Sequence, residues 1–142
     1  MATLTNTRKV RIEWGDCDPM GIVFFPRYLA MFDDCTAYLF ERALGLTKFR
    51  MMQVYDFAGF PLVDVRARFL LPSRFGDDVE IESSVAEFRR SSFVVQHRLR
   101  KAHELAVECS ETRVWIRRHP DDRNEMQSQP VPLEVKERFG VA

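Results

Sequence analysis

The chain has 142 residues, of which 46% are hydrophobic and 12% aromatic, and this length and composition favour one compact domain over residues 1–142 with a real hydrophobic core. Its 21 basic and 21 acidic side chains cancel, which excludes a global electrostatic field of the kind that attracts nucleic acid or an anionic membrane. Any basic site must therefore be local.

The first predicted element is a strand over residues 9–14. In this segment Val10, Ile12 and Trp14 alternate with charged side chains, which is the period-two pattern of a half-buried strand. We therefore expect these three side chains to face the core together.

A long helix is predicted after the segment GDCDPMGIVFFPRY, residues 15–28. Pro26 suits a first helical turn, and Gly45 suits a helix end. Between these two residues, side chains recur at helical spacing and predict a largely buried face: Leu29, Phe32, Cys35, Thr36, Leu39, Phe40 and Ala43.

Residues 46–60 form a mixed segment in which we expect a short helix and a loop. After this segment, hydrophobic side chains again alternate with polar ones, with a period of two residues. A strand over residues 63–71 ends at Pro72, and further strands over residues 79–85 and 93–99 flank a turn with the sequence RRSS. The predicted core face of the first of these strands consists of Val63, Val65, Ala67, Phe69 and Leu71.

The last predicted strand changes parity along its length. Leu105, Val107 and Cys109 share one face, whereas Val114 and Ile116 belong to the other. A bulge between Ser110 and Thr112 would reconcile the two halves. The remaining tail is predicted to be a polar loop with at most a short helix through LEVKERF, residues 133–139.

The order of these elements is one strand, one long helix and about four consecutive strands, which is typical of the α+β class with an antiparallel sheet packed on a helix. One helix cannot cover such a sheet completely, and its edge strands remain open. We therefore expect edge pairing into a homodimer.

The cysteines Cys17, Cys35 and Cys109 are odd in number and far apart, which indicates neither a disulfide framework nor a zinc site. No metal site and no cofactor are expected. The number and spacing of the cysteines fit a reducing compartment, so a cytoplasmic location is predicted. The first 14 residues lack the apolar segment of a secretory signal, and no stretch reaches the length of a membrane span.

The charged and reactive side chains of residues 15–28 allow several interpretations. A calcium loop begun by Asp16 and Asp18 is disfavoured, because Met20 and Arg27 occupy positions that should carry ligands. A nucleophilic role for Cys17 is disfavoured by its flanking carboxylates, and a buried, inert thiol is preferred. Elsewhere in the chain, His97 lies on an apolar strand face and is interpreted as a hydrogen-bonded core or interface residue.

Two interpretations of the carboxylates remain. Asp16 and Asp18 can be turn residues whose side chains accept hydrogen bonds from free backbone N–H groups, an interpretation that we favour for Asp16. The functional alternative depends on Gly21, which permits a close backbone approach, and on the N–H groups at the positive end of the predicted helix, which can stabilise an oxyanion. A carboxylate beside such an end and an aromatic wall suits acyl transfer.

The motif GDCDPMGIVFFPRYLAMFDD resembles the signature of the 4-hydroxybenzoyl-CoA thioesterase family of hot-dog-fold proteins, and AEFRRSSF, residues 86–93, extends the resemblance. The resemblance implies a curved antiparallel sheet wrapped around one long central helix. It also implies dimers that pair their sheets edge to edge, further association into homotetramers, and active sites at the dimer interface.

By this resemblance Asp18 matches the catalytic carboxylate, acting as nucleophile or general base. The N–H of Phe25 matches the donor that polarises the thioester carbonyl, and Gly21 makes room for the substrate. Arg89 and Arg90 match the basic turn that holds the nucleotide phosphates of coenzyme A. Ser91, which follows that turn, stands where some relatives carry a third cation.

The implied substrate is an acyl-CoA. Phe24, Phe25 and Tyr28 could line a pocket for a benzoyl-type acyl group or could belong to the core. A hydroxybenzoyl thioester is the first expectation and a short aliphatic acyl-CoA the second. A module that binds acyl-CoA without turnover is the alternative from another class.

Overall fold

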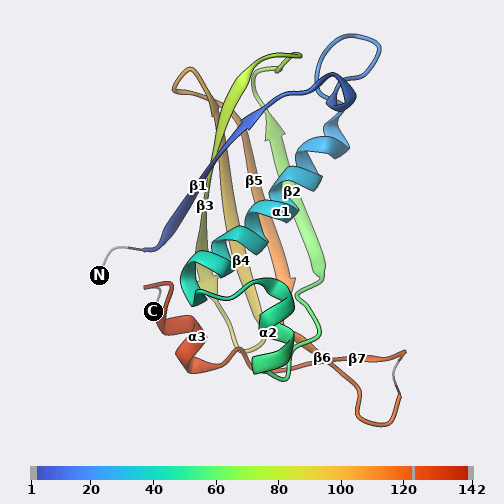
Figure 1. Cartoon of the computed structure of the whole chain (residues 1–142), viewed down its shortest axis with the longest axis vertical. Coiled ribbons are helices and arrows are strands. Elements are labelled where there is room, and N and C mark those ends of the chain that lie inside the picture. Colours follow the sequence, from blue (N-terminus) through green and yellow to red (C-terminus); the bar gives the residue numbers. More distant parts are fainter. Residues whose placement is uncertain (1–2, 123, 141–142) are drawn as a thin grey trace.

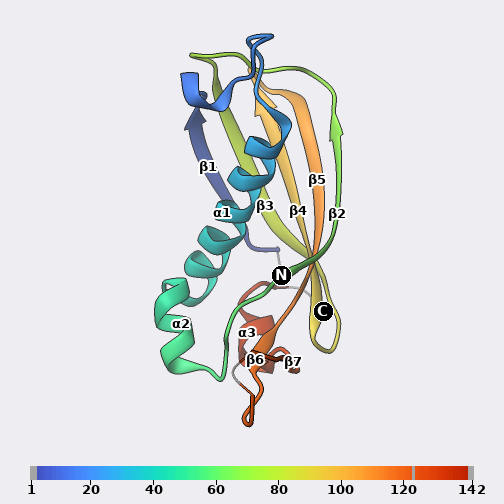
Figure 2. The same cartoon turned by 90° about the vertical axis from the view of Figure 1, so that its right-hand side faces the viewer.

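The computed structural model of the protein describes residues 3–122 and 124–140. Five strands form one antiparallel sheet in the order β1-β3-β4-β5-β2, and the long helix α1 lies along the face toward which this sheet curves (Figures 1 and 2). The strands are β1 (Thr5–Arg11), β2 (Leu62–Phe69), β3 (Asp78–Phe88), β4 (Ser92–Lys101) and β5 (Glu104–Val114). The α+β architecture predicted from the sequence is confirmed.

The remaining elements are short, apart from α1. The helices are α1 (Phe25–Leu44), α2 (Lys48–Val54) and α3 (Leu133–Glu137), with a 3-10 turn η1 (Trp14–Asp16) and a hairpin of β6 (Ile116–Arg118) and β7 (Met126–Ser128). The short helices were expected, whereas the β6–β7 hairpin lies in a segment predicted to be a loop. None of the helices in the described ranges combines the length and the apolar character that a membrane span requires.

Helix α1 follows its sequence signals closely. Pro26 occupies its first turn, and Gly45 ends it with φ at 68° while donating its N–H to the Glu41 carbonyl at 2.8 Å. The predicted apolar face is buried against the sheet, with Leu29 half-buried. Burial of this stripe fixes the helix, so the position of its first turn relative to the sheet is also fixed.

The first strand ends earlier than predicted. β1 stops at Arg11, and Ile12 is completely buried, but Trp14 begins η1 and is 73% exposed. The Asp16 N–H donates to the Glu13 carbonyl at 3.0 Å and closes a tight turn. This turn ends the alternation, so the prediction that Trp14 faces the core is wrong.

The bulge predicted between Ser110 and Thr112 of the last strand is wrong in its position. β5 keeps one parity from Val107 to its end, and its core-facing positions include Glu111 and Arg113, which are only 2% and 3% exposed. The irregularity of the β4–β5 ladder lies instead near the start of β5, where Leu99 pairs with Val107 and Arg100 with Leu105, so that Ala106 is the extra residue. The alternation therefore continues through two charged residues that pattern reasoning places outside.

Strand β2 lies at the edge of the sheet and, among the described residues, pairs only with β5. Its predicted core face is largely exposed, because α1 comes closest to β1 and β3, which lie toward the opposite edge of the sheet. Apolar side chains of β2 and the residue after it are therefore exposed in the single chain: Leu62, Val63, Val65, Phe69 and Leu70.

The molecule has two distinct ends along the strands (Figure 1). The upper end carries residues 12–24, the start of α1, residues 70–77 and the turn at residues 102–103. The lower end carries the close of α1, the turn at residues 89–91, α2 and α3. These two names are used below.

Candidate active site

Asp18 lies at the upper end in a tightly closed loop before α1. Its backbone N–H donates to the Ile22 carbonyl at 2.9 Å, and its carbonyl accepts from the Gly21 N–H at 2.9 Å. Gly21 has φ at 81°, a left-handed conformation that explains the glycine. The half-buried Asp18 side chain accepts a hydrogen bond from the Met20 N–H through Oδ1 at 2.8 Å, which orients the carboxylate.

Asp16 serves the turn, as its preferred interpretation predicted. Its Oδ2 accepts a hydrogen bond from the Glu13 N–H at 2.9 Å, and its carbonyl accepts one from the Phe24 N–H at 2.8 Å. The second bond ties the loop to the start of α1. Asp16 thereby holds the loop of Asp18 against the helix end.

The N–H of Phe25, the first residue of α1, meets no acceptor in the described part of the chain. The neighbouring donors are accounted for, because Phe24 donates to Asp16 and Pro26 has no N–H. The dipole of a twenty-residue helix adds partial positive charge at this point. The Phe25 N–H is therefore a free hydrogen-bond donor at the first residue of α1, where the carbonyl-polarising group was predicted.

An apolar cavity of about 280 Å³ opens beside this helix start. Phe25 and Tyr28 line it from α1, Ile22 and Val23 from the Asp18 loop, and residues 69–72 from the end of β2. Burial raises the pKa of Tyr28, so its hydroxyl stays protonated at neutral pH. Phe24 is exposed and lies outside this lining, with its ring packed edge-on to that of Phe25 at 5.6 Å.

The predicted phosphate-binding turn lies elsewhere. Arg89 and Arg90 are exposed at the lower end, where Arg89 pairs with Glu87 at 3.2 Å. The Ser91 carbonyl accepts from the Trp115 N–H at 2.8 Å, which anchors the turn. Asp18, Gly21, Phe25 and Tyr28 thus meet at one end of the chain, and the Arg89–Ser91 turn stands at the other.

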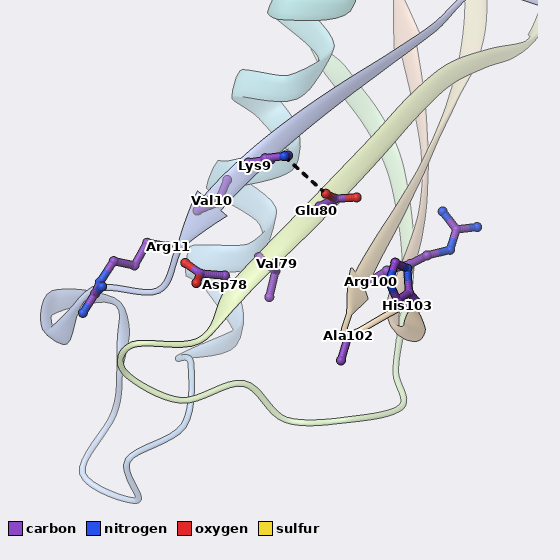
Figure 3. Close-up of a pocket in the computed structure, with 9 residues that line it drawn as sticks. All are labelled: Lys9, Val10, Arg11, Asp78, Val79, Glu80, Arg100, Ala102 and His103. Atoms are coloured by element: carbon purple, nitrogen blue, oxygen red, sulfur yellow. Dashed lines mark ion pairs between the residues drawn. The ribbon is translucent and has the colours of Figure 1, made fainter.

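A larger cavity of about 440 Å³ lies on the outer face of the sheet (Figure 3). Charged side chains of both signs surround it, and Lys9 and Glu80 form an ion pair across β1 and β3 at 4.0 Å. Arg100 and His103 stand on the opposite side of this cavity from Arg11 (Figure 3). None of the predicted site residues lines it.

A buried polar network, missed from the sequence, crosses the core between α1 and the sheet. His97 Nε2 lies 2.9 Å from Glu111 Oε1, and Ser83 Oγ lies 2.7 Å from Nδ1 of the same ring. Thr36 of α1 donates its hydroxyl to Glu111 at 2.6 Å. The prediction that His97 is a hydrogen-bonded core residue is confirmed.

Arg113 completes this network and carries it to the surface. It donates to Glu111 Oε2 at 2.9 Å, to the Phe60 carbonyl at 3.1 Å and to Asp33 on α1 at 2.8 Å. Burial alone would raise the pKa of Glu111, but hydrogen bonds and charge from His97 and Arg113 lower it to about 2. Glu111 is therefore a carboxylate at neutral pH, and the network joins α1 to β4 and β5.

The thiols show no sign of nucleophilic activation. Burial raises the pKa of Cys35, and it raises that of Cys109 to about 12. Cys17 is half-buried, less than predicted, and its Sγ donates to the Glu13 carbonyl at 3.7 Å. Across residues 3–122 and 124–140, no group of three or more His, Cys, Asp or Glu side chains could hold a metal ion.

Comparison with known proteins gives three kinds of match. The profile of the thioesterase-like superfamily matches residues 12–139. The 4-hydroxybenzoyl-CoA thioesterase of Pseudomonas sp. strain CBS-3 is 32% identical over 137 residues, covering 92% of this chain and 94% of that protein.

Two solved structures superpose over almost the whole chain. A mutant 4-hydroxybenzoyl-CoA thioesterase complexed with 4-hydroxybenzoyl-CoA is 30% identical, covers 95% of this chain and 98% of that chain, and has a TM-score of 0.86. A gentisyl-coenzyme A thioesterase is 28% identical, covers 95% and 99% of the two chains, and has a TM-score of 0.78. The hot-dog fold implied by the sequence is confirmed. The chain belongs to the thioesterase-like superfamily and is a thioester hydrolase.

Proposed function

We propose that this protein hydrolyses an acyl-CoA thioester, with a hydroxybenzoyl-CoA as its first candidate substrate. The observation that carries the proposal is the free Phe25 N–H at the start of α1, a short loop away from the oriented carboxylate of Asp18. An apolar cavity opens beside both elements. Similarity to a 4-hydroxybenzoyl-CoA thioesterase supports the choice of acyl group.

In the proposed reaction, the thioester carbonyl oxygen accepts a hydrogen bond from the Phe25 N–H, which stabilises the negative charge that develops there. Asp18 then acts in one of two ways. Its free oxygen attacks the carbonyl carbon and expels the coenzyme A thiolate, and water hydrolyses the resulting anhydride. Alternatively, Asp18 takes a proton from a water that attacks the same carbon. Both routes yield the free acid and coenzyme A.

The position of the carboxylate suits either route. Met20 holds Oδ1 by its N–H, so Oδ2 is the oxygen available for reaction. The left-handed Gly21 lets the loop turn back toward α1 without a side chain on that side. Single-turnover quenching would trap an acylated protein on the nucleophilic route and free acid alone on the general-base route.

We also propose that the active form is a homodimer paired through β2. This strand has an unpaired edge, and Val63 is 60% exposed with other apolar neighbours along the strand. A second copy of β2 would satisfy the backbone groups and cover the apolar side chains. Association of two dimers into a homotetramer stays a prediction.

Antiparallel pairing of β2 with its copy also unites the predicted site. Such pairing inverts the partner, so the partner's lower end lies beside the upper end of this chain. The Arg89–Arg90 turn is then within reach of a coenzyme A whose thioester lies at Asp18 of the other chain. The turn connects β3 and β4. At a spacing of about 4.8 Å between neighbouring strands, it lies about 12 Å across the sheet from β2 of the same chain.

Thiol release from a panel of coenzyme A thioesters tests the proposal. The panel contains 4-hydroxybenzoyl-, benzoyl-, acetyl- and butyryl-CoA, and a thiol reagent reports free coenzyme A. We expect the highest kcat/KM for the hydroxybenzoyl ester. Saturable binding of every ester without thiol release would overturn the proposal in favour of a binding module, and a preference for butyryl-CoA would reassign the acyl group.

A further inference from the structure

The segment of residues 70–77, which connects β2 to β3, forms one wall of the 280 Å³ cavity beside the start of α1, called the acyl cavity below. Its first three residues line that cavity. The N–H groups of Leu70 and Leu71 donate to the Ala106 carbonyl at 2.8 and 3.1 Å, so the segment begins against the sheet. Pro72 has no N–H to continue this bonding. Beyond Leu71, the wall therefore depends on other contacts.

Lys101, the last residue of β4, supplies such a contact with its ammonium group. Its Nζ donates to the Pro72 carbonyl at 2.8 Å and to Asp77 Oδ2 at 3.3 Å. Both charged side chains are only about one third exposed, at 32% for Lys101 and 33% for Asp77, so water and salt screen the pair less than a fully exposed one. One cation thus fastens the segment near its middle and at its end.

Asp77 carries this anchoring back along the segment. Its Oδ2 also accepts the Arg74 N–H at 2.8 Å, and its own N–H donates to the Arg74 carbonyl at 3.0 Å, which closes a tight turn. The Arg74 N–H and the Lys101 ammonium lower the pKa of Asp77, so its carboxylate is charged at neutral pH. The Ser73 carbonyl accepts the N–H of Val23, another residue of the cavity lining, at 2.9 Å.

A tight hairpin turn fixes the backbone at Lys101. This residue pairs with Glu104 across β4 and β5, which leaves only Ala102 and His103 to form the loop. Both loop residues have positive φ, 49° and 69°, as a two-residue turn of type I′ requires. The lysine side chain therefore extends from a strand end that the sheet holds in place to a segment outside the sheet.

We propose that Lys101 is a positioning residue for acyl-group binding, which holds residues 70–77 and thereby keeps the wall of the acyl cavity in place. It acts through Pro72, which lines the cavity and whose carbonyl it binds. The loop of Asp18 is closed by its own backbone hydrogen bonds, so loss of the lysine should weaken binding of the acyl group and leave the chemical step intact. This inference rests on the proposed function.

The substitution Lys101→Met tests this role, because it keeps an unbranched apolar side chain and removes the cation. We expect KM for 4-hydroxybenzoyl-CoA to rise about tenfold and kcat to stay within about twofold, since the wall contacts the ground state and the transition state alike. Lys101→Arg keeps a charged donor and should hold KM within about twofold of the wild type. An unchanged KM, or a lower kcat alone as expected from a smaller folded fraction, would overturn the proposal.

Trp14 reports on the same segment without turnover. Its ring packs edge to face on that of Phe75 at 5.5 Å between centroids and is 73% exposed, whereas Trp115, the second tryptophan of the chain, is 1% exposed. Time-resolved anisotropy measures local motion of Trp14 as a fast component, which Trp14→Phe should remove. We expect Lys101→Met to enlarge this component, because Phe75 moves with the loosened segment. A fast component that Lys101→Met leaves unchanged would overturn the proposal.

Lys9→Met is the matched control. Lys9 also pairs with a carboxylate, that of Glu80 at 4.0 Å, but this pair joins two strands, β1 and β3. The control should leave KM and the anisotropy unchanged, and an equal rise of KM in both variants would overturn the proposal as a general effect of charge. A wild type that releases no thiol from any ester would refute the proposed function. Normal turnover by the wild type and by Lys101→Met alike would refute this inference alone.

Discussion

Asp18 accepts the N–H of Met20 through Oδ1 at 2.8 Å, which leaves its second carboxylate oxygen without a hydrogen-bond partner in the described part of the chain. Asparagine can keep the same hydrogen bond through its amide oxygen but offers no second oxygen. The substitution Asp18→Asn therefore separates chemistry from loop structure.

We expect Asp18→Asn to lower kcat for the best ester by roughly two orders of magnitude or more, because the nucleophile or general base is lost. Thiol release gives the rate, and thermal unfolding should show a Tm close to that of the wild type. Asp18→Ala, which also removes the acceptor for Met20, is the companion variant. Full turnover by the asparagine variant would end the assignment of Asp18.

The double variant Arg89→Ala with Arg90→Ala should raise KM about tenfold or more and leave kcat nearly unchanged. Phosphate contacts far from the reacting carbon hold the ground state and the transition state alike. A thioester of pantetheine, which lacks the nucleotide, serves as the control substrate and should be hydrolysed equally by both proteins. A lower kcat at constant KM would contradict the phosphate role.

Substitution Val63→Lys tests the proposed dimer. Val63 is 60% exposed in the single chain, so the change should leave the fold intact while placing a charge in each copy at the apolar strand edge that the partner covers. We expect the dimer Kd to rise at least about tenfold and activity to fall with it. Sedimentation and thiol release at matched concentrations measure both, with Lys9→Ala on β1 as a control at the other edge.

Substitution Glu111→Gln should destabilise the fold by roughly 3 kcal/mol, because it removes the buried counter-charge of the Arg113 guanidinium and leaves only the exposed Asp33 as its acidic partner. Denaturant unfolding measures the change. The double variant Glu111→Gln with Arg113→Met should recover part of the loss, since it removes the buried guanidinium that has lost this partner. A single variant as stable as the wild type would show that the network contributes little.

Glu111 also predicts how stability depends on pH. Its folded pKa of about 2 lies below its ordinary value of 4.5, so the unfolded chain binds the proton first on acidification. The contribution of Glu111 is fully present above pH 4.5 and is lost as the pH falls toward 2. The free energy of unfolding should therefore fall in this window for the wild type, and Glu111→Gln should show a shallower decline.

The elements were predictable wherever local chemistry determines them. Pro26 and Gly45 mark the ends of α1 because each constrains its own backbone, and the alternation in β3 and β4 follows from burial of one sheet face. Trp14 was misplaced because the pattern gives no sign that the strand ends at Arg11. The turn after the strand is closed by hydrogen bonds of the Glu13 and Asp16 main chain and of the Asp16 side chain, which hydrophobic periodicity does not record.

The inward charges of β5 were missed for a different reason. Hydrophobic alternation assigns Glu111 and Arg113 to solvent, and their burial is possible only because His97, Thr36 and Asp33 supply partners from other elements. The sequence did carry one signal. Continuing the parity of Val107 and Cys109 would have placed both charges inside and called for such partners.

The candidate site was predictable as far as it is contiguous in the chain. Asp18, Gly21 and Phe25 lie within one loop and one helix start, so local geometry places them together. The Arg89–Arg90 turn is brought to that site only by a second copy, and the pattern of one chain does not specify the orientation of a partner. The same limit applies to β2, most of whose apolar residues are exposed in the single chain.

Asp18 lies at the upper end of the fold and the Arg89–Arg90 turn at the lower end, and this arrangement allows subunit complementation. A protein with Asp18→Asn and another with both arginines replaced should each be impaired alone. In a mixed dimer, one catalytic centre combines both defects, whereas the other takes its intact carboxylate from one polypeptide and its intact cations from the other. Co-expression of two defective alleles would then restore activity at half of the centres in every hybrid.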